Sequence, residues 1–222
     1  MKRYITEPFR FKILAINACF IATIVFTAET FAQAKENANF KAGIEAYQAN
    51  NLPLAYEEFL TAARSGHADS QFNVALMYEQ GIGVAKDEKE AVVWYGKSAA
   101  QDNSAAQYNL GVLYENGRGT TIDFAKANEW YRKASVHGDP LAIGNLGMLY
   151  IRGQGVKENK VAGLALLLVS ATMDSSPQNH AKQNISTTRG LTSEMISEAQ
   201  ALAQELSSAN NFLTPLDNYL KE

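Results

Sequence analysis

The chain has 222 residues, of which 46% are hydrophobic and 19% charged, a composition typical of soluble globular proteins and unlike that of disordered or fibrous chains. Its formal net charge of −3 lacks the basic excess of nucleic-acid-binding proteins, so we expect no nucleic-acid partner. The single cysteine, Cys19, excludes an intramolecular disulfide and a four-cysteine zinc site. The three histidines show no metal-ligand spacing, and we expect neither a metal nor a cofactor.

The first 34 residues have the features of a secretory signal peptide. An apolar run, residues 13–28, follows four basic residues and precedes a small-x-small sequence at residues 32–34. We therefore predict a signal peptide over residues 1–34 with cleavage after Ala34, and a periplasmic or secreted mature chain. That mature chain has 16 basic and 21 acidic residues and a formal net charge of −5.

Two alternatives for this segment stay open. Cys19 is the attachment residue if the chain is a lipoprotein, although Asn17 fits a lipid-attachment sequence poorly. The apolar run is also the candidate for an uncleaved membrane anchor, but its 16 residues fall short of the roughly 20 that span a bilayer. We expect no integral membrane span in the mature chain.

A repeat of 36 residues fills the middle of the chain without gaps, over residues 67–102, 103–138 and 139–174. Such a period is the signature of a stacked array of supersecondary units. Several residues recur at equivalent positions in all three copies: Asn73, Asn109 and Asn145; Tyr78, Tyr114 and Tyr150; Gly81, Gly117 and Gly153; and Gly83, Gly119 and Gly155.

Each copy predicts two helices joined by a short turn. The first has apolar residues at helical spacing and ends at a glycine that adopts a left-handed conformation, at Gly81 in the first copy. The second begins after a side chain that caps free backbone amides, such as Asp87, and Glu90 completes the pattern of a capping box. We expect the large side chains of Trp94 and Trp130 to fill the space between repeats.

Helices are also predicted on both sides of the three copies. Residues 35–66 predict a helix pair whose connecting loop has no Gly-x-Gly sequence. Residues 175–222 predict a capping helix and a tail. The helix has one apolar face formed by Ile196, Ala199, Leu202, Ala203 and Leu206, as the end of a solenoid requires. The tail from residue 207 either folds back onto the array or binds a partner.

The segments NLGVLYENGRGT, DFAKANEWYRKAS and NLGMLYIRGQGV resemble the Sel1-like repeat, a relative of the tetratricopeptide repeat. The resemblance implies an all-α fold, an α/α superhelix of tetratricopeptide-like and Sel1-like helix pairs. It also implies a non-enzymatic scaffold or adaptor that binds a protein or peptide partner. Many bacterial members are exported and act in the cell envelope or in host contact.

The resemblance also implies a binding surface, because the first helix of each tetratricopeptide pair lines the concave face. The positions carried over are Phe72, Glu79, Gln80, Tyr108, Glu115, Asn116, Met148 and Arg152. Glu79 and Glu115 favour a segment that has a positive charge. We interpret the repeated glycines and the tryptophans as structural, and likewise Asn73, Asn109 and Asn145, whose amides we expect to bond to backbone groups.

No catalytic arrangement is recognisable. The GIG and GRG sequences are explained as turns, since neither continues as a dinucleotide-binding fingerprint. No nucleophile lies in a sequence pattern that pairs it with a base. The alternative function is an envelope-glycan or β-lactam-binding or hydrolysing protein, by analogy with cysteine-rich relatives whose disulfides this chain lacks.

Overall fold

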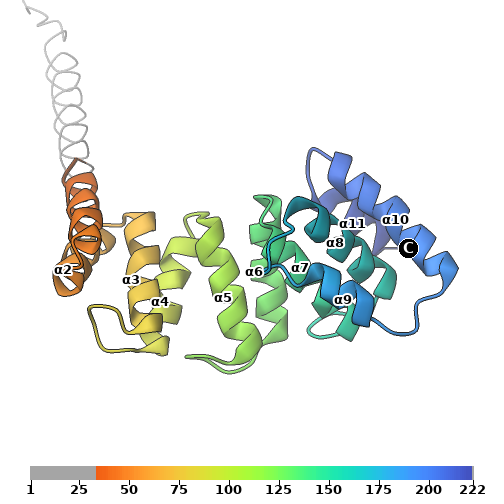
Figure 1. The fold of residues 1–222 in the computed structure, drawn as a ribbon, viewed down its shortest axis with the longest axis horizontal. Coiled ribbons are helices and arrows are strands. Elements are labelled where there is room, and N and C mark those ends of the chain that lie inside the picture. The colour runs from red at the N-terminus through yellow and green to blue at the C-terminus, as the bar shows by residue number, and fades with distance from the viewer. Residues whose placement is uncertain (1–33, 222) are drawn as a thin grey trace, which may run out of the picture.

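A computed structural model describes residues 34–221 and shows an elongated row of packed helices (Figure 1). Every regular element in this range is a helix, which confirms the predicted all-α repeat fold. The predicted signal peptide lies outside the described residues except for Ala34, the first residue of the described helix over residues 34–48.

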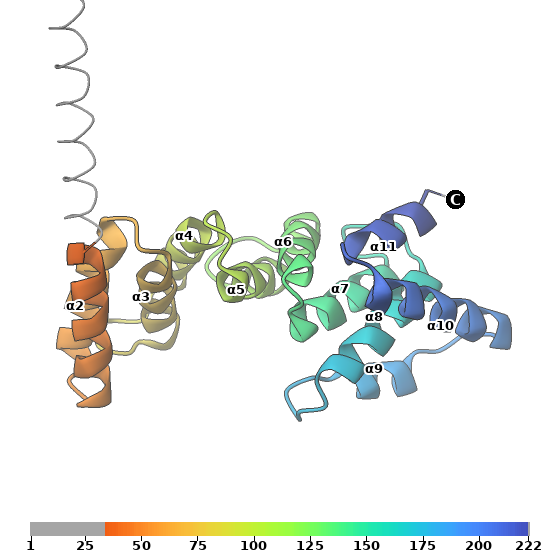
Figure 2. The ribbon, with the colours of Figure 1, turned by 90° about the horizontal axis from the view of Figure 1, so that it is seen from above.

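The array over residues 34–221 consists of four antiparallel helix pairs followed by three C-terminal helices. The helix over residues 34–48 pairs with α2 (Leu52–Arg64). The three repeats form α3 (Ala68–Gln80) with α4 (Glu88–Ala99), α5 (Ser104–Asn116) with α6 (Phe124–Val136), and α7 (Pro140–Arg152) with α8 (Lys160–Met173). The C-terminal part contains α9 (Ala181–Thr187), α10 (Ser193–Ser208) and α11 (Leu213–Tyr219). Figure 2 shows the same row from above.

Side-chain caps begin the helices where the sequence predicts them. The Asp87 carboxylate accepts hydrogen bonds from the backbone N–H groups of Lys89 and Glu90, at 2.9 and 3.1 Å. Asn103, Asp123, Asp139 and Asn159 cap their helices in the same way. The predicted capping box is only half formed, because the Asp87 N–H donates to the Tyr78 carbonyl instead of to Glu90.

The two glycines of each loop have different roles. The first one ends the preceding helix in the left-handed conformation, with φ of 74° at Gly81 and 67° at Gly117. The second lies against the start of the preceding pair's second helix: a Cβ on Gly119 would lie 2.0 Å from the Glu88 carbonyl oxygen. Gly83 and Gly155 make the equivalent approach to Leu52 and Phe124. Each loop is therefore seated on the pair before it.

Alanine, leucine and aromatic side chains fill the space between helices. Tyr95 and Tyr131 are fully buried, and Trp94 is 7% exposed. The Lys97 ammonium lies 3.7 Å from the centre of the Trp94 ring, and Lys133 lies 4.0 Å from that of Trp130. Each ammonium thus covers an aromatic face while staying at the surface.

The C-terminal helices cover α8, and this explains why the third repeat is the most apolar. Leu166 and Leu167 replace the Trp-Tyr pair and are fully buried, because α9 and α10 both pack on α8. Ala199, Leu202 and Leu206 of α10 are buried, as predicted for a capping helix. Ile196 is 39% exposed, so its assignment to that buried face was wrong. Helix α9 was not predicted.

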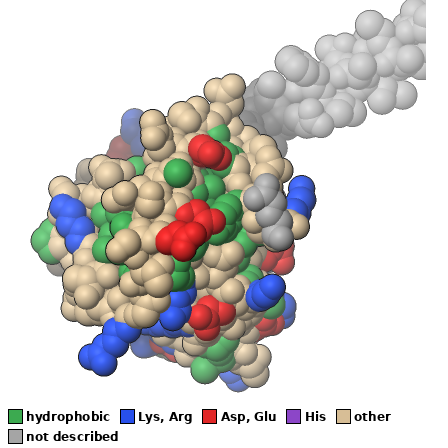
Figure 3. Space-filling model, turned by 90° about the vertical axis from the view of Figure 1, so that its right-hand side faces the viewer, with side chains coloured by type: hydrophobic (Ala, Val, Ile, Leu, Met, Phe, Trp, Pro, Cys, Tyr) green, Lys and Arg blue, Asp and Glu red, His purple; other side chains and the backbone are tan. Residues whose placement is uncertain are grey.

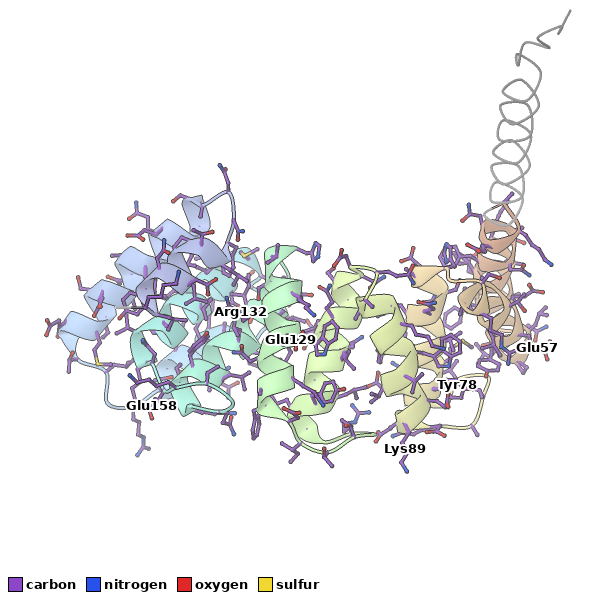
Figure 4. All side chains as sticks on the ribbon, turned by 180° about the vertical axis from the view of Figure 1, so that it is seen from behind. Glu57, Tyr78, Lys89, Glu129, Arg132 and Glu158 are labelled. Carbon is purple, nitrogen blue, oxygen red and sulfur yellow. The ribbon has the colours of Figure 1, made fainter. Side chains whose placement is uncertain are left out.

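The tail folds back onto the array. Seen from above, α9 and α11 lie on opposite sides of α8 (Figure 2). Leu216 of α11 is fully buried, and Asp217 forms an ion pair with Arg132 of α6, which also donates to the Tyr150 hydroxyl at 3.3 Å. Arg132 lies on α6, the helix that faces the C-terminal part in Figure 4. This settles the alternative that the sequence left open in favour of an intramolecular contact.

Candidate functional site on the first helices

Two of the four first helices make the same contact with their second helix, and this contact sets the register of the pairs. A Cβ added to Gly43 would lie 2.5 Å from the Phe59 ring, and one added to Gly111 would lie 2.6 Å from the Tyr131 ring. Gly43 and Gly111 therefore occupy the same position, each against an aromatic ring of its own second helix. In this register residues 40, 44, 47 and 48 are equivalent to residues 72, 76, 79 and 80. We call the surface formed by these positions and their repeats the first-helix face.

Two predicted binding residues, Phe72 and Tyr108, are half-buried. Each packs on the buried tyrosine of its own second helix: the centre of the Phe72 ring lies 5.7 Å from that of Tyr95, and Tyr108 lies 6.0 Å from Tyr131. Part of each ring is therefore already used in the packing of the pair, and only the remaining surface is available to a partner.

The two predicted carboxylates differ from each other. Glu79 accepts a hydrogen bond from the Tyr95 hydroxyl at 2.7 Å and forms an ion pair with Arg118 at 3.0 Å. Glu115 accepts the equivalent bond from Tyr131 at 2.6 Å. In the part of the chain that the structure describes, no lysine or arginine pairs with Glu115. The expectation that both attract a positive charge therefore needs correction, because Arg118 already neutralises Glu79.

Two of the three repeated asparagines hydrogen-bond to the same tyrosine hydroxyls. The Asn145 side chain donates to the Tyr131 hydroxyl at 3.1 Å, and Asn109 hydrogen-bonds to Tyr95. The expected backbone partners are therefore not the ones observed, although the amides do connect helices. Each tyrosine hydroxyl links the first helix of its own pair to the first helix of the next.

Burial and the neighbouring carboxylates together raise the pKa of these tyrosines. Loss of hydration has the largest effect at both Tyr95 and Tyr131, and the negative charges of Glu79 and Glu115 add to it. Burial likewise raises the pKa of Tyr108. All three hydroxyls are consequently neutral hydrogen-bonding groups at neutral pH, and none is an activated nucleophile.

The other predicted residues lie at or near the ends of their helices. Gln80 and Arg152 are exposed and are the last residues of α3 and α7. Asn116 is also exposed, but its amide donates to the Val112 carbonyl of its own helix at 2.9 Å. Met148 is half-buried. The first-helix face thus has exposed polar ends and a half-buried centre.

The structure adds a cavity that sequence reasoning missed. It has a volume of about 450 Å³ and lies between the helix over residues 34–48 and α3. Its lining is Ile44, Tyr47, Gln48, Phe59, Asn73, Leu76, Met77 and Ile82. We call it the N-terminal pocket. The signal in the sequence is confined to three lining positions, Tyr47, Phe59 and Ile82, where the next repeat has a glutamate, a tyrosine and an arginine. It is visible only once residues 34–48 are placed in register.

Other surfaces offer less to a ligand. A shallow cavity between α10 and α11 includes Glu198 and Glu205, and acidic side chains gather near the centre of that end of the molecule (Figure 3). Within residues 34–221 no group of three or more potential metal ligands occurs. No helix in the same range is long and apolar enough to cross a membrane.

The three repeats match a known protein family. The Sel1 repeat profile matches residues 68–103, 104–139 and 140–175. The chain contains three Sel1 repeats. Sel1-repeat proteins are in general protein-interaction scaffolds, and their fold is typically non-enzymatic.

Solved structures of similar fold agree with this assignment. A protective antigen present in uropathogenic Escherichia coli strains, with an SLR fold, is 28% identical with a TM-score of 0.63, over 85% of this chain and 46% of that one. A Sel1 repeat protein from Oxalobacter formigenes is 24% identical with a TM-score of 0.63, over 91% and 99% of the two chains, and shows the fold alone. Exopolysaccharide production negative regulators of Rhizobium meliloti and Rhizobium leguminosarum are each 39% identical over 62 residues, which span 28% of this chain and 23% of theirs.

Proposed function

We propose that this Sel1-repeat protein is a non-enzymatic adaptor that binds a partner polypeptide along its first-helix face. The observation that carries the proposal is the composition of that face. It presents half-buried aromatic rings, an uncompensated carboxylate at Glu115, and exposed amides in successive repeats. Aromatic residues in partly enclosed positions are the usual anchors of protein interfaces.

The face is suited to an extended or helical segment. An aromatic ring, a carboxylate and an amide recur at equivalent positions of the first two repeats, so a segment lying across α3 and α5 meets the same kind of contact twice. The third repeat has Gly144, Ile151 and Arg152 at these positions. The buried Tyr–Glu–Asn contacts hold the neighbouring first helices together, and little ordering is needed when a partner binds.

Site-specific photocrosslinking tests the binding face. A photoreactive phenylalanine analogue at Gln80 or Asn116 is exposed on the first-helix face, and the same analogue at Val93 or Glu129 is exposed on second helices as a matched control. We expect discrete crosslinked products, in cells that express the protein, from the first pair of positions only. Equal products from both pairs, or products from the second pair alone, would refute the proposed face.

We also propose that the adaptor works after export, in the periplasm or outside the cell. The support is the basic, apolar and small-residue order of residues 1–34. Mass spectrometry of the protein isolated from its host tests this point. A mature chain beginning at Lys35 agrees with cleavage, whereas a lipid on Cys19 or an intact N-terminus would require a membrane-attached adaptor.

A further inference from the structure

A crevice lies between each first helix and the next, and the side chains that close it differ among its three copies. Between α3 and α5 it is closed by the Tyr95 hydroxyl, Glu79, Arg118 and Asn109. Arg118 also pairs with Glu88 at 2.9 Å, so it joins the first and second helices of one pair to the loop of the next. In this version Glu79, Glu88 and Arg118 are all paired.

The next crevice, between α5 and α7, keeps the tyrosine, glutamate and asparagine but loses the cation. Gln154 stands at the position of Arg118, and its side-chain oxygen is buried without a hydrogen-bond partner. Glu115 therefore has its Tyr131 hydrogen bond but no basic partner in the described residues. A carboxylate in this state is complementary to a positive charge supplied from outside.

The first crevice has lost the polar closure and is the N-terminal pocket. Phe59 replaces the tyrosine, Tyr47 replaces the glutamate, and Ile82 replaces the arginine. Asn73 keeps the repeated amide, but Phe59 has no hydroxyl to offer it. The result is an opening of about 450 Å³ without a charged lining residue, beside the 50% exposed ring of Tyr47.

We propose that the N-terminal pocket binds one large apolar side chain of the partner polypeptide, and that Glu115 binds a basic side chain of the same segment. The proposal rests on the proposed function and names the chemistry of its partner. The volume is in the range of small-molecule ligand pockets, so it is large enough for one side chain. Asn73 is placed to hydrogen-bond the partner's backbone next to that side chain. Arg118 prevents Glu79 from competing for the positive charge.

A selection from a library of random 12-residue peptides displayed on phage, with the purified protein as bait, identifies the probes. We expect enriched peptides to contain a Leu, Ile, Met or Phe and a Lys or Arg. If no peptide is enriched, the proposed function is refuted together with the pocket. If the enriched peptides lack either residue type, the pocket or the Glu115 contact is wrong while the binding function stands.

Affinities of synthetic enriched peptides then locate the contacts. Replacement of the peptide's apolar residue by Ala should weaken binding to the wild type about tenfold, or about 1.4 kcal/mol, because most of the buried apolar side chain is lost. The same peptide replacement should change the affinity for the Leu76→Trp protein little, because the tryptophan fills the pocket. Phe59→Tyr restores the hydroxyl of the later repeats and provides a second, milder closure that does not depend on tolerance of a tryptophan.

Glu115→Gln should weaken the Lys-containing peptide several-fold and leave its Lys→Ala version unaffected. If the change of the peptide's apolar residue to Ala costs the same affinity with the wild type, with Leu76→Trp and with Phe59→Tyr, that result refutes binding in the N-terminal pocket. Val93→Trp, an exposed second-helix position, is the control and should change neither affinity.

Discussion

Replacement of Gly119 by alanine tests how the loops of this array are seated. The new Cβ would lie 2.0 Å from the Glu88 carbonyl oxygen and 2.4 Å from its carbon, distances that no real contact reaches. These are backbone atoms of the preceding pair, so a rotamer change cannot relieve the contact. Gly119 also has φ of +68°, in the left-handed region.

The cost has two separable parts. A left-handed conformation costs a residue with a Cβ about 1–2 kcal/mol, and overpacking against a well-packed neighbour costs about 1–3 kcal/mol. We therefore expect Gly119→Ala to lower the free energy of unfolding by roughly 2–5 kcal/mol, the sum of those two ranges. This is a large part of the stability of a small domain.

Two other glycines provide matched controls. Gly66 has φ of +113° but no atom within 4 Å of an added Cβ, so Gly66→Ala measures the conformational cost alone. Gly96 lies inside α4 with nothing within 4 Å, and Gly96→Ala should stabilise by about 0.5–1 kcal/mol through helix propensity.

Urea unfolding followed by circular dichroism, with Trp94 and Trp130 fluorescence as local probes, measures all three variants. The expected order of stability is Gly96→Ala, wild type, Gly66→Ala and then Gly119→Ala. If Gly119→Ala loses no more stability than Gly66→Ala, the contact between the loop and the preceding pair does not explain why position 119 requires glycine.

Three further predictions concern the contacts between pairs. Burial raises the folded-state pKa of Tyr95 and Tyr131, so the unfolded chain loses these protons at a lower pH than the folded chain does. Their contribution to stability is complete below about pH 10, the pKa of free tyrosine, and falls as the pH rises further. In urea unfolding, the free energy of unfolding of Tyr95→Phe should therefore decrease less than that of the wild type between neutral and strongly alkaline pH. Arg118→Gln should lower the free energy of unfolding by at most about 1 kcal/mol in low salt and by less in high salt, because the ion pairs of Arg118 are partly exposed. A decrease that is independent of salt in thermal unfolding would contradict this. Leu216→Ala should release α11 while the array stays folded, so hydrogen exchange should accelerate in residues 213–219 and stay unchanged in α3 to α6; uniform acceleration would refute separate docking of the tail.

Features that depend on local spacing could be predicted from the sequence. The caps at Asp87 and Asn103 and the left-handed glycines follow from side-chain chemistry and backbone sterics within a few residues. The repeat then determines the helix pairs, since each amphipathic pair must bury its face against an identical neighbour. Helix α9 escaped prediction because its seven residues show no apolar period, and its position depends on contact with α8.

The candidate site was predicted only in outline. The sequence places Glu79 and Glu115 at equivalent positions, but the cation of Glu79 comes from the loop of the following repeat. That contact joins residues 39 positions apart and becomes visible only when the pairs are stacked. Similarly, the N-terminal pocket depends on Phe59, Tyr47 and Ile82 meeting from three separate elements.

The seating of each loop on the preceding pair makes the array modular. Gly83, Gly119 and Gly155 meet Leu52, Glu88 and Phe124, which are themselves spaced by one 36-residue period. A chain with residues 103–138 duplicated in tandem would therefore form at its new junction the same contact that exists at the old one. Each inserted unit would lengthen the first-helix face by one row of side chains. The number of inserted units at which affinity stops rising would then measure the length of the segment that the partner presents.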